Sequence, residues 1–161
     1  MFEKAFELIL YLEGKKSNHP NDPGGKTNYG ITQKTYDAWK TKKGLPHADV
    51  FSITEQEAKD IYYSEYWLVG GCDKLTPKLA VCHFQAVVLL WKTRATKILT
   101  DVNNIQNERK SLTEESLCFL YLTLQYNVLK TLLQMNEKLE IFRFGWINRL
   151  SKTFKFISNM E

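Results

Sequence analysis

Apolar side chains recur at helical spacing at the start of the chain. They occupy positions Phe2, Ala5, Phe6, Ile9 and Leu10. This spacing predicts an amphipathic helix over residues 2–13 that ends at Glu13, with Gly14 as its C-terminal cap. The stretch that follows, KKSNHPNDPGGKTNYG, holds two prolines and three glycines among Asn, Asp and Ser. Such dense turn chemistry predicts a loop or a short irregular hairpin.

Helix-start signals recur along the rest of the chain. Thr54 and Glu57 have the spacing of a capping box, and Thr76 precedes a proline that suits the first helical position. Thr113 is followed by two glutamates and is a further candidate capping residue at a helix start. We therefore expect helices over residues 33–43, from Thr54 to about Trp67, over 77–91, around 92–101 and from Thr113 to about Met135, followed by a short aromatic segment from Phe142 to about Ile157.

Length and composition are those of one folded domain. The 161 residues include 43% hydrophobic and 25% charged side chains, which is usual for a globular protein and excludes a disordered chain. The sequence shows no internal repeat, low-complexity tract or linker. These features predict a mainly α, single domain over residues 1–161 with a small irregular or β-like lobe near the N-terminus.

The cysteine and histidine positions favour neither disulfides nor metal. Cys72, Cys82 and Cys118 are odd in number and lack a C-x-x-C spacing, so we expect reduced thiols, most of them packed in the core. The histidines also lack metal-ligand spacing. We expect no metal site and no cofactor.

The N-terminus lacks the basic start, continuous apolar stretch and small-residue cleavage site of a signal peptide. The most apolar run, from Leu79 to Trp91, is interrupted by His83 and Gln85 and is shorter than the about 20 residues that span a bilayer. We expect no integral membrane segment and synthesis in the cytoplasm without a signal peptide. A substrate outside the cytoplasm would be reached only with the help of another system.

The net charge of +4 lies wholly in the second half of the chain. Residues 1–80 hold 11 basic and 11 acidic side chains, whereas residues 81–161 hold 11 and 7. This basic excess favours binding to an anionic partner, such as cell-wall polymer, nucleic acid or acidic lipid, and does not distinguish among these. A nucleic-acid-binding helical domain is a weaker hypothesis. We expect no nucleic-acid partner, because the aromatic and basic residues after Phe142 have the helical spacing of a core face backed by a solvated face.

The stretch ELILYLEGKKSNHPNDPGGKTNYGIT holds a candidate hydrolytic constellation. Eight residues separate Glu13 from Asp22, and four more separate Asp22 from Thr27. Glycoside hydrolysis uses an acid that donates to the leaving oxygen and a second carboxylate that activates water or attacks the sugar. Partial desolvation at the end of an apolar helix would raise the pKa of Glu13 and suit it as the acid. Asp22 would be the ionised partner and Thr27 would orient water, unless these residues form only a generic turn beside a surface charge.

The full motif E-G-x-x-S-N-x-P-x-D-P-G-G-x-T-N-Y-G-I-T resembles that of the glycoside hydrolase family 108 muramidases. The resemblance continues in the aromatic segment from Ile61 to Trp67 and in G-W-x-N-R, which ends at Arg149. It implies a lysozyme-like helical fold, peptidoglycan as substrate, no metal, and Glu13 at the catalytic position. The carboxylate spacing is also similar to that of phage-type lysozymes, which usually have five residues before the threonine where this chain has four.

Candidate substrate-binding residues follow from the same motif and from the buried helix. They are Gly25, where backbone can approach a sugar, Asn28, Tyr29 and Gln85. Tyr29 would stack on a sugar or pack between lobes. The buried helix departs from the family, because Gln85, Leu89 and Trp91 stand where the family commonly has Asp, Asn and Gly. Apolar side chains there predict a narrowed cleft, or a partner or second copy that covers them.

The sequence thus predicts a muramidase that cleaves the β-1,4 bond after N-acetylmuramic acid. Glu13 would protonate the leaving oxygen, with Asp22 and Thr27 assisting. The expected partner is the peptidoglycan glycan strand, and a holin or secretion machinery would give access to the cell wall. Self-association and a catalytically weakened peptidoglycan-binding module of the same fold are the alternatives that the departures raise.

Overall fold

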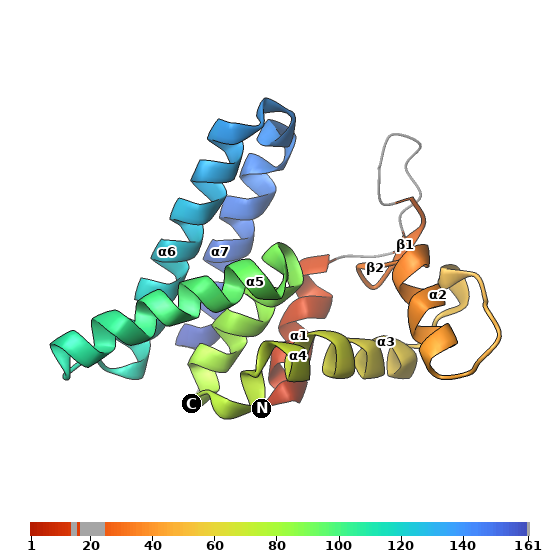
Figure 1. Ribbon diagram of the computed structural model, residues 1–161, viewed down its shortest axis with the longest axis horizontal. Coiled ribbons are helices and arrows are strands. Elements are labelled where there is room, and N and C mark those ends of the chain that lie inside the picture. The colour runs from red at the N-terminus through yellow and green to blue at the C-terminus, as the bar shows by residue number, and fades with distance from the viewer. Residues whose placement is uncertain (14–15, 17–24, 161) are drawn as a thin grey trace.

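The computed structural model describes residues 1–13, 16 and 25–160 (Figure 1). The helices of this described part are α1 (Phe2–Glu13), α2 (Gln33–Lys42), α3 (Glu55–Ile61), α4 (Leu68–Gly70), α5 (Pro77–Arg109), α6 (Glu114–Met135) and α7 (Arg143–Ser158). The short strands are β1 (Thr27–Asn28) and β2 (Ile31–Thr32). Short helical segments of other pitch are η1 (Val50–Ser52), η2 (Tyr62–Trp67), η3 (Cys72–Lys74) and η4 (Glu137–Phe142).

Three helices begin where their capping residues predict. At α3 the Glu57 backbone N–H donates to the Thr54 hydroxyl at 3.1 Å, and the Thr54 N–H donates back to the Glu57 carboxylate at 3.0 Å. Thr113 caps α6 by accepting from the Ser116 N–H at 3.2 Å. Pro77 opens α5. The predicted capping box and helix starts are confirmed.

Two helices run further than the sequence pattern predicts. The helix that begins at α3 continues through η2, a wider π-helical turn, and through α4, and it ends at Gly71 with φ 70°. The helices expected over 77–91 and 92–101 are the two parts of α5, and the non-helical backbone angles of Trp91 divide them where the sequence predicts. The expected end near residue 101 is wrong, because buried Ile98 and Val102 keep this part of α5 packed on the core.

The small lobe consists of a two-stranded hairpin with α2 and η1. In the hairpin Thr27 pairs with Thr32 and Asn28 pairs with Ile31 in antiparallel register. The two turn residues, Tyr29 and Gly30, have φ of 53° and 74°, as a type I′ turn requires. The predicted irregular or β-like lobe is confirmed.

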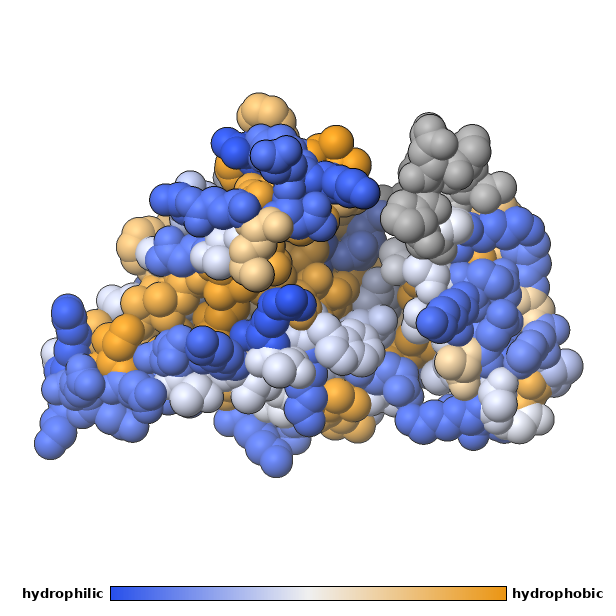
Figure 2. Space-filling model, turned by 45° about the horizontal axis from the view of Figure 1, so that its top comes forward, coloured by the Kyte–Doolittle hydropathy of each residue, from blue (hydrophilic) through white to orange (hydrophobic). Residues whose placement is uncertain are grey.

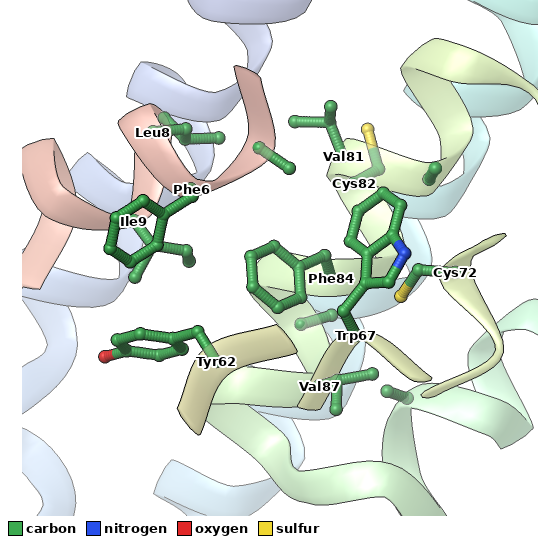
Figure 3. Packing of buried hydrophobic residues seen from close by; sticks show 14 of the residues in the cluster. Phe6, Leu8, Ile9, Tyr62, Trp67, Cys72, Val81, Cys82, Phe84 and Val87 are labelled. Atoms are coloured by element: carbon green, nitrogen blue, oxygen red, sulfur yellow. The ribbon is translucent and has the colours of Figure 1, made fainter. Parts of the chain in front are cut away.

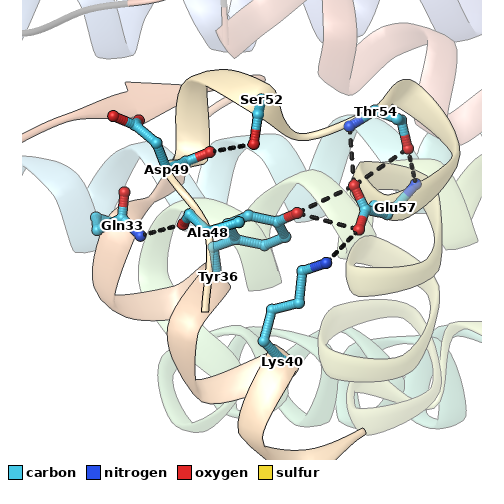
Figure 4. A network of polar contacts seen from close by, with 8 residues as sticks. All are labelled: Gln33, Tyr36, Lys40, Ala48, Asp49, Ser52, Thr54 and Glu57. Carbon is cyan, nitrogen blue, oxygen red and sulfur yellow. Dashed lines mark hydrogen bonds and ion pairs between the residues drawn. The ribbon is translucent and has the colours of Figure 1, made fainter. Parts of the chain in front are cut away.

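A polar network joins the small lobe to α3 (Figure 4). Glu57 accepts from the Tyr36 hydroxyl at 3.0 Å and from the Lys40 ammonium at 2.8 Å. Partial burial alone would raise the pKa of Glu57, but the bonds from Lys40, the Thr54 N–H and Tyr36 together lower it to about 2. The ionised carboxylate therefore holds α2 against α3.

A central part of the hydrophobic core lies between α1, η2 and α5 (Figure 3). Phe6 of α1 and Phe84 of α5 both pack on Tyr62, with ring centroids 5.8 and 6.2 Å from it. Leu8 and Ile9 of α1 are fully buried. This packing fixes α1 along its length, and the C-terminal end of α1 lies toward the small lobe (Figure 1).

The three cysteines are buried free thiols, as expected. Burial raises the pKa of Cys72 to about 12, so this thiol stays protonated at neutral pH. In the part of the chain that the structure describes, no helix is long and apolar enough to cross a membrane.

The surface differs between the two ends of the molecule (Figure 2). Apolar side chains are exposed on the helical end of the molecule, whereas the visible face of the small lobe is mainly polar. The large exposed apolar residues of α6, η4 and α7 are Phe119, Tyr126, Met135, Ile141, Phe142, Phe144, Ile147 and Phe154. A mainly α fold with a small N-terminal lobe is confirmed.

Candidate active site

Glu13 is the last residue of α1 and is held by an ion pair with α7. Arg149 donates from Nη1 to Glu13 Oε1 at 2.6 Å. The Glu13 side chain is 21% exposed and that of Arg149 only 9%. Because one carboxylate oxygen is fixed and the group still reaches the surface, Glu13 is both oriented and accessible to a substrate.

Arg149 is itself fixed by Gln85 of α5. Its Nε donates to Gln85 Oε1 at 3.1 Å, and its Nη2 donates to the Gln85 backbone carbonyl at 3.3 Å. Gln85 Nε2 donates in turn to Gln125 Oε1 of α6 at 2.6 Å. A buried network from four helices therefore positions the Glu13 carboxylate.

Gly30 brings the hairpin turn directly against Glu13. A Cβ atom at residue 30 would lie 2.7 Å from Glu13 Cγ and 2.8 Å from Glu13 Oε2. These distances are too short for any side chain, and the φ of 74° also favours glycine. The turn can approach the carboxylate only because residue 30 is glycine.

Two tyrosines of η2 lie within the electrostatic reach of Glu13. Burial raises the pKa of Tyr62 and of Tyr66, and the negative charge of Glu13 raises both further. Both phenols are therefore neutral at ordinary pH. The Tyr62 hydroxyl donates to the Tyr29 carbonyl at 2.9 Å, which links η2 to the hairpin turn beside Gly30.

Trp91 stands beside Tyr66 at the bend in α5. Their ring centroids are 5.6 Å apart and the ring planes are nearly perpendicular, at 89°. Trp91 has φ 67° and ψ 162°, a region populated almost only by glycine, where a larger residue costs on the order of 1–3 kcal/mol. Its residue surface is nevertheless 57% exposed. Leu89, by contrast, is half-buried and packs on the core.

A family model described as glycosyl hydrolase 108 matches residues 6–90, which is more than half of the 161 residues. The chain belongs to the glycosyl hydrolase 108 family. The solved structure of Brucella abortus SagA is similar, with 27% sequence identity and a TM-score of 0.77. The match covers 98% of this chain and 93% of the SagA chain. No curated protein sequence matches the chain.

Family membership confirms the lysozyme-like fold and makes the chain a glycoside hydrolase with a role in peptidoglycan hydrolysis. Of the three predicted catalytic residues, the structure describes Glu13 and Thr27 and does not describe Asp22. Glu13 lies at the centre of the network above. Asp22 lies outside the described residues. Thr27 is half-buried in β1, opposite Thr32.

The predicted substrate-binding residues of the small lobe differ in how far they can reach a ligand. Gly25 has φ 64° and open space where a side chain would stand. Asn28 is buried and donates to the Val50 carbonyl at 3.4 Å, so its side chain is used inside the lobe. Tyr29 is half-buried at the turn. A role in substrate binding stays a prediction for Gly25 and Tyr29.

The prediction for Gln85 needs a correction. Gln85 is fully buried, and its amide is engaged with Arg149, Gln125 and the Cys82 carbonyl. A side chain in this position has no surface to offer a glycan. Gln85 acts on the site through Arg149, as a positioning residue.

Two residues of the site were not among the predicted site residues. Arg149 was visible only as the last position of the G-W-x-N-R element, and Gly30 only as part of the longer motif. Sequence spacing gives no sign that Arg149 reaches Glu13 across 136 positions. A pocket of about 570 Å³ lies between α6, η4 and α7, but its lining residues do not include Glu13. Among the described residues, no group of three or more His, Cys, Asp or Glu side chains is placed to bind a metal.

Proposed function

We propose that this family 108 glycosidase cleaves the β-1,4 bond after N-acetylmuramic acid in peptidoglycan, with Glu13 as the general acid. The observation that supports the proposal most is the asymmetric setting of the Glu13 carboxyl group. Arg149 occupies Oε1, whereas Oε2 lies on the side of the Gly30 turn. Oε2 is thus the oxygen that would hold the proton and deliver it to the leaving glycosidic oxygen.

Arg149 would assist this step electrostatically. When Glu13 gives up its proton, the carboxylate that forms lies against a fixed guanidinium, whose bonds to Gln85 leave it little freedom to move. With Glu13 protonated in the substrate complex, the negative charge appears only as the proton leaves, and such a preorganised charge then stabilises the transition state more than the ground state. Asp22 is proposed to activate water or to stabilise the positive charge on the sugar, and Thr27 to orient the water.

The test compares Glu13→Gln with Glu7→Gln. Both residues lie on α1, but Glu7 is exposed and serves as the matched control. Clearing of purified peptidoglycan should fall about 10²–10⁴-fold in the first variant and stay at the wild-type rate in the second. Retention of more than about a tenth of the activity in Glu13→Gln contradicts the assignment, since general acid catalysis supplies more than that.

Product analysis tests the bond. Reduction of the released fragments with borohydride should convert N-acetylmuramic acid, and not N-acetylglucosamine, at the new reducing ends. Reduced N-acetylglucosamine would place the cleavage at the other glycosidic bond. A wild-type protein that binds insoluble peptidoglycan without releasing reducing ends would instead be the catalytically weakened binding module. Access to the wall through a holin or a secretion system stays a prediction.

A further inference from the structure

Trp91 combines two features that stability alone does not explain. Its backbone adopts φ 67° and ψ 162°, which strains any side chain, and its large apolar residue surface is 57% exposed. Glycine would relieve the strain and remove the exposed apolar surface at once. A strained and exposed indole at this position therefore indicates a role in contacting something outside the protein.

The indole belongs to a row of aromatic side chains that leads to the hairpin turn beside the proposed acid. Tyr66 contacts Trp91 at 5.6 Å and Tyr62 at 5.3 Å between ring centroids. The Tyr62 hydroxyl donates to the Tyr29 carbonyl, next to the Gly30 turn that lies against Glu13. The perpendicular contact covers only part of the indole. A helical residue would direct its side chain back along α5, whereas the bend at residue 91 gives the ring a different direction. The bend thus holds an exposed indole at the outer end of the aromatic row that leads to the Glu13 site.

We propose that Trp91 is a specificity-determining residue whose indole stacks on one N-acetylhexosamine ring of the β-1,4-linked glycan strand. This inference rests on the proposed function and names a contact for its substrate. The face of a pyranose ring presents aliphatic C–H groups, which a flat aromatic ring covers at little conformational cost. The contact would select strands long enough to place a sugar over residue 91 and would not depend on charge.

The experiment measures glycan binding apart from turnover. Peptide-free glycan strands of alternating N-acetylglucosamine and N-acetylmuramic acid are titrated into Glu13→Gln protein that has Trp91, Trp91→Gly or Trp91→Phe. Trp91→Gly should bind about tenfold more weakly, the order expected for one lost aromatic stack, and Trp91→Phe within about threefold. The change in tryptophan fluorescence on binding should vanish in Trp91→Phe.

Melting separates a binding role from a structural one. Trp91→Gly should melt at or above the temperature of the parent protein, because glycine adopts this backbone conformation without strain. Phe144→Ala, which removes an exposed ring at the start of α7, is the control and should leave affinity unchanged. Equal affinity of Trp91→Gly and its parent overturns the inference. A joint loss of affinity and melting temperature also overturns it, because the indole would then be a structural residue.

The two proposals fail in different ways. If the wild-type protein releases no reducing ends but Trp91→Gly still weakens binding, the proposed function fails and the stacking contact stands. If the wild-type protein cleaves and Trp91→Gly binds like its parent, the stacking contact fails and the proposed function stands.

Discussion

Arg149 Nη1 donates to Glu13 Oε1 at 2.6 Å and so joins the last helix of the chain to the first. The family model matches residues 6–90 and so includes Glu13, whereas Arg149 lies outside the matched range, in α7. The SagA similarity extends over 98% of the chain and includes that helix. The candidate acid is therefore supplied by the matched N-terminal half, and the group that orients it comes from the C-terminal helix.

Arg149→Lys should lower peptidoglycan clearing about 10- to 100-fold and reduce the free energy of unfolding by about 1–3 kcal/mol. Lysine keeps the charge but cannot bond Glu13 and both Gln85 acceptors with one planar group. Arg143→Lys is the matched control on the same helix, where the arginine pairs with exposed Glu140. Initial clearing rates and urea unfolding measure both effects. Full activity of Arg149→Lys would show that charge alone, and not geometry, is required.

Gln85→Leu distinguishes a positioning residue from a substrate ligand. The substitution removes the buried partner of the Gln125 amide and of Arg149 Nε, so we expect a loss of about 1–3 kcal/mol of stability and a lower kcat. Glycan affinity, measured in the Glu13→Gln background, should stay within about twofold of the parent protein, because a fully buried side chain makes no contact with ligand. A loss of affinity without a loss of stability would restore Gln85 as a substrate-binding residue.

Gly30→Ala should damage activity more than its backbone strain explains. The new Cβ would meet Glu13 Cγ at 2.7 Å, so either the turn or the carboxylate must move. Gly44→Ala is the matched control, since Gly44 has a similar φ of 68° but open space around the added atom. Both variants should lose about 1 kcal/mol of stability through strain, and only Gly30→Ala should lose more than about tenfold in clearing rate. Equal activities would show that the turn does not constrain Glu13.

The local structure was largely predictable from sequence, because it depends on neighbouring residues. Helical spacing placed α1 at residues 2–13, and the Thr54–Glu57 capping box and Pro77 placed two further helix starts. Glu13 could be placed at the end of α1 from its neighbours in the sequence as well, because the apolar spacing stops there. These features arise within one or two helical turns, and sequence patterns describe that range well.

The long-range features of the site were not predictable in this way. Periodicity cannot show whether a polar residue on a buried helix faces a cleft or a buried network. Gln85 was predicted to bind substrate in the cleft, whereas its side chain is fully buried in the network. The boundary expected between residues 91 and 92 does fall at the non-helical Trp91, but helical spacing cannot show that this residue adopts φ 67°. The Glu13–Arg149 pair depends on how α1 and α7 pack, which is a property of the whole fold.

His83 should make the protein less stable in mild acid. It is fully buried, and its two ring nitrogens contact the Tyr121 hydroxyl at 2.8 Å and the Gly70 carbonyl at 3.0 Å. A carbonyl only accepts, so Nε2 donates to Gly70 and Nδ1 accepts from Tyr121. Burial lowers the pKa of His83 to about 4, although the bond to Gly70 acts in the opposite direction. Protonation would place an uncompensated charge in the core.

The sign of the effect follows from the two pKa values of His83. Between the unfolded value of 6.5 and the folded value of about 4, the unfolded chain binds a proton that the folded protein does not. The His83 contribution is therefore complete above pH 6.5 and is lost as the pH falls, by roughly 2–3 kcal/mol at pH 4. Glu57, with a pKa of about 2, loses its contribution only below its ordinary value of 4.5.

Urea unfolding at pH 7.5, 6.5, 5.5 and 4.5 measures the loss, with His83→Gln and His47→Gln as the matched variants. His83→Gln should be less stable than wild type at neutral pH but should lose less stability between pH 6.5 and 4.5, because glutamine does not titrate. His47 is exposed, so His47→Gln should keep the wild-type slope. If wild type and His83→Gln lose stability in parallel over this range, the buried imidazole is not the group that responds to acid.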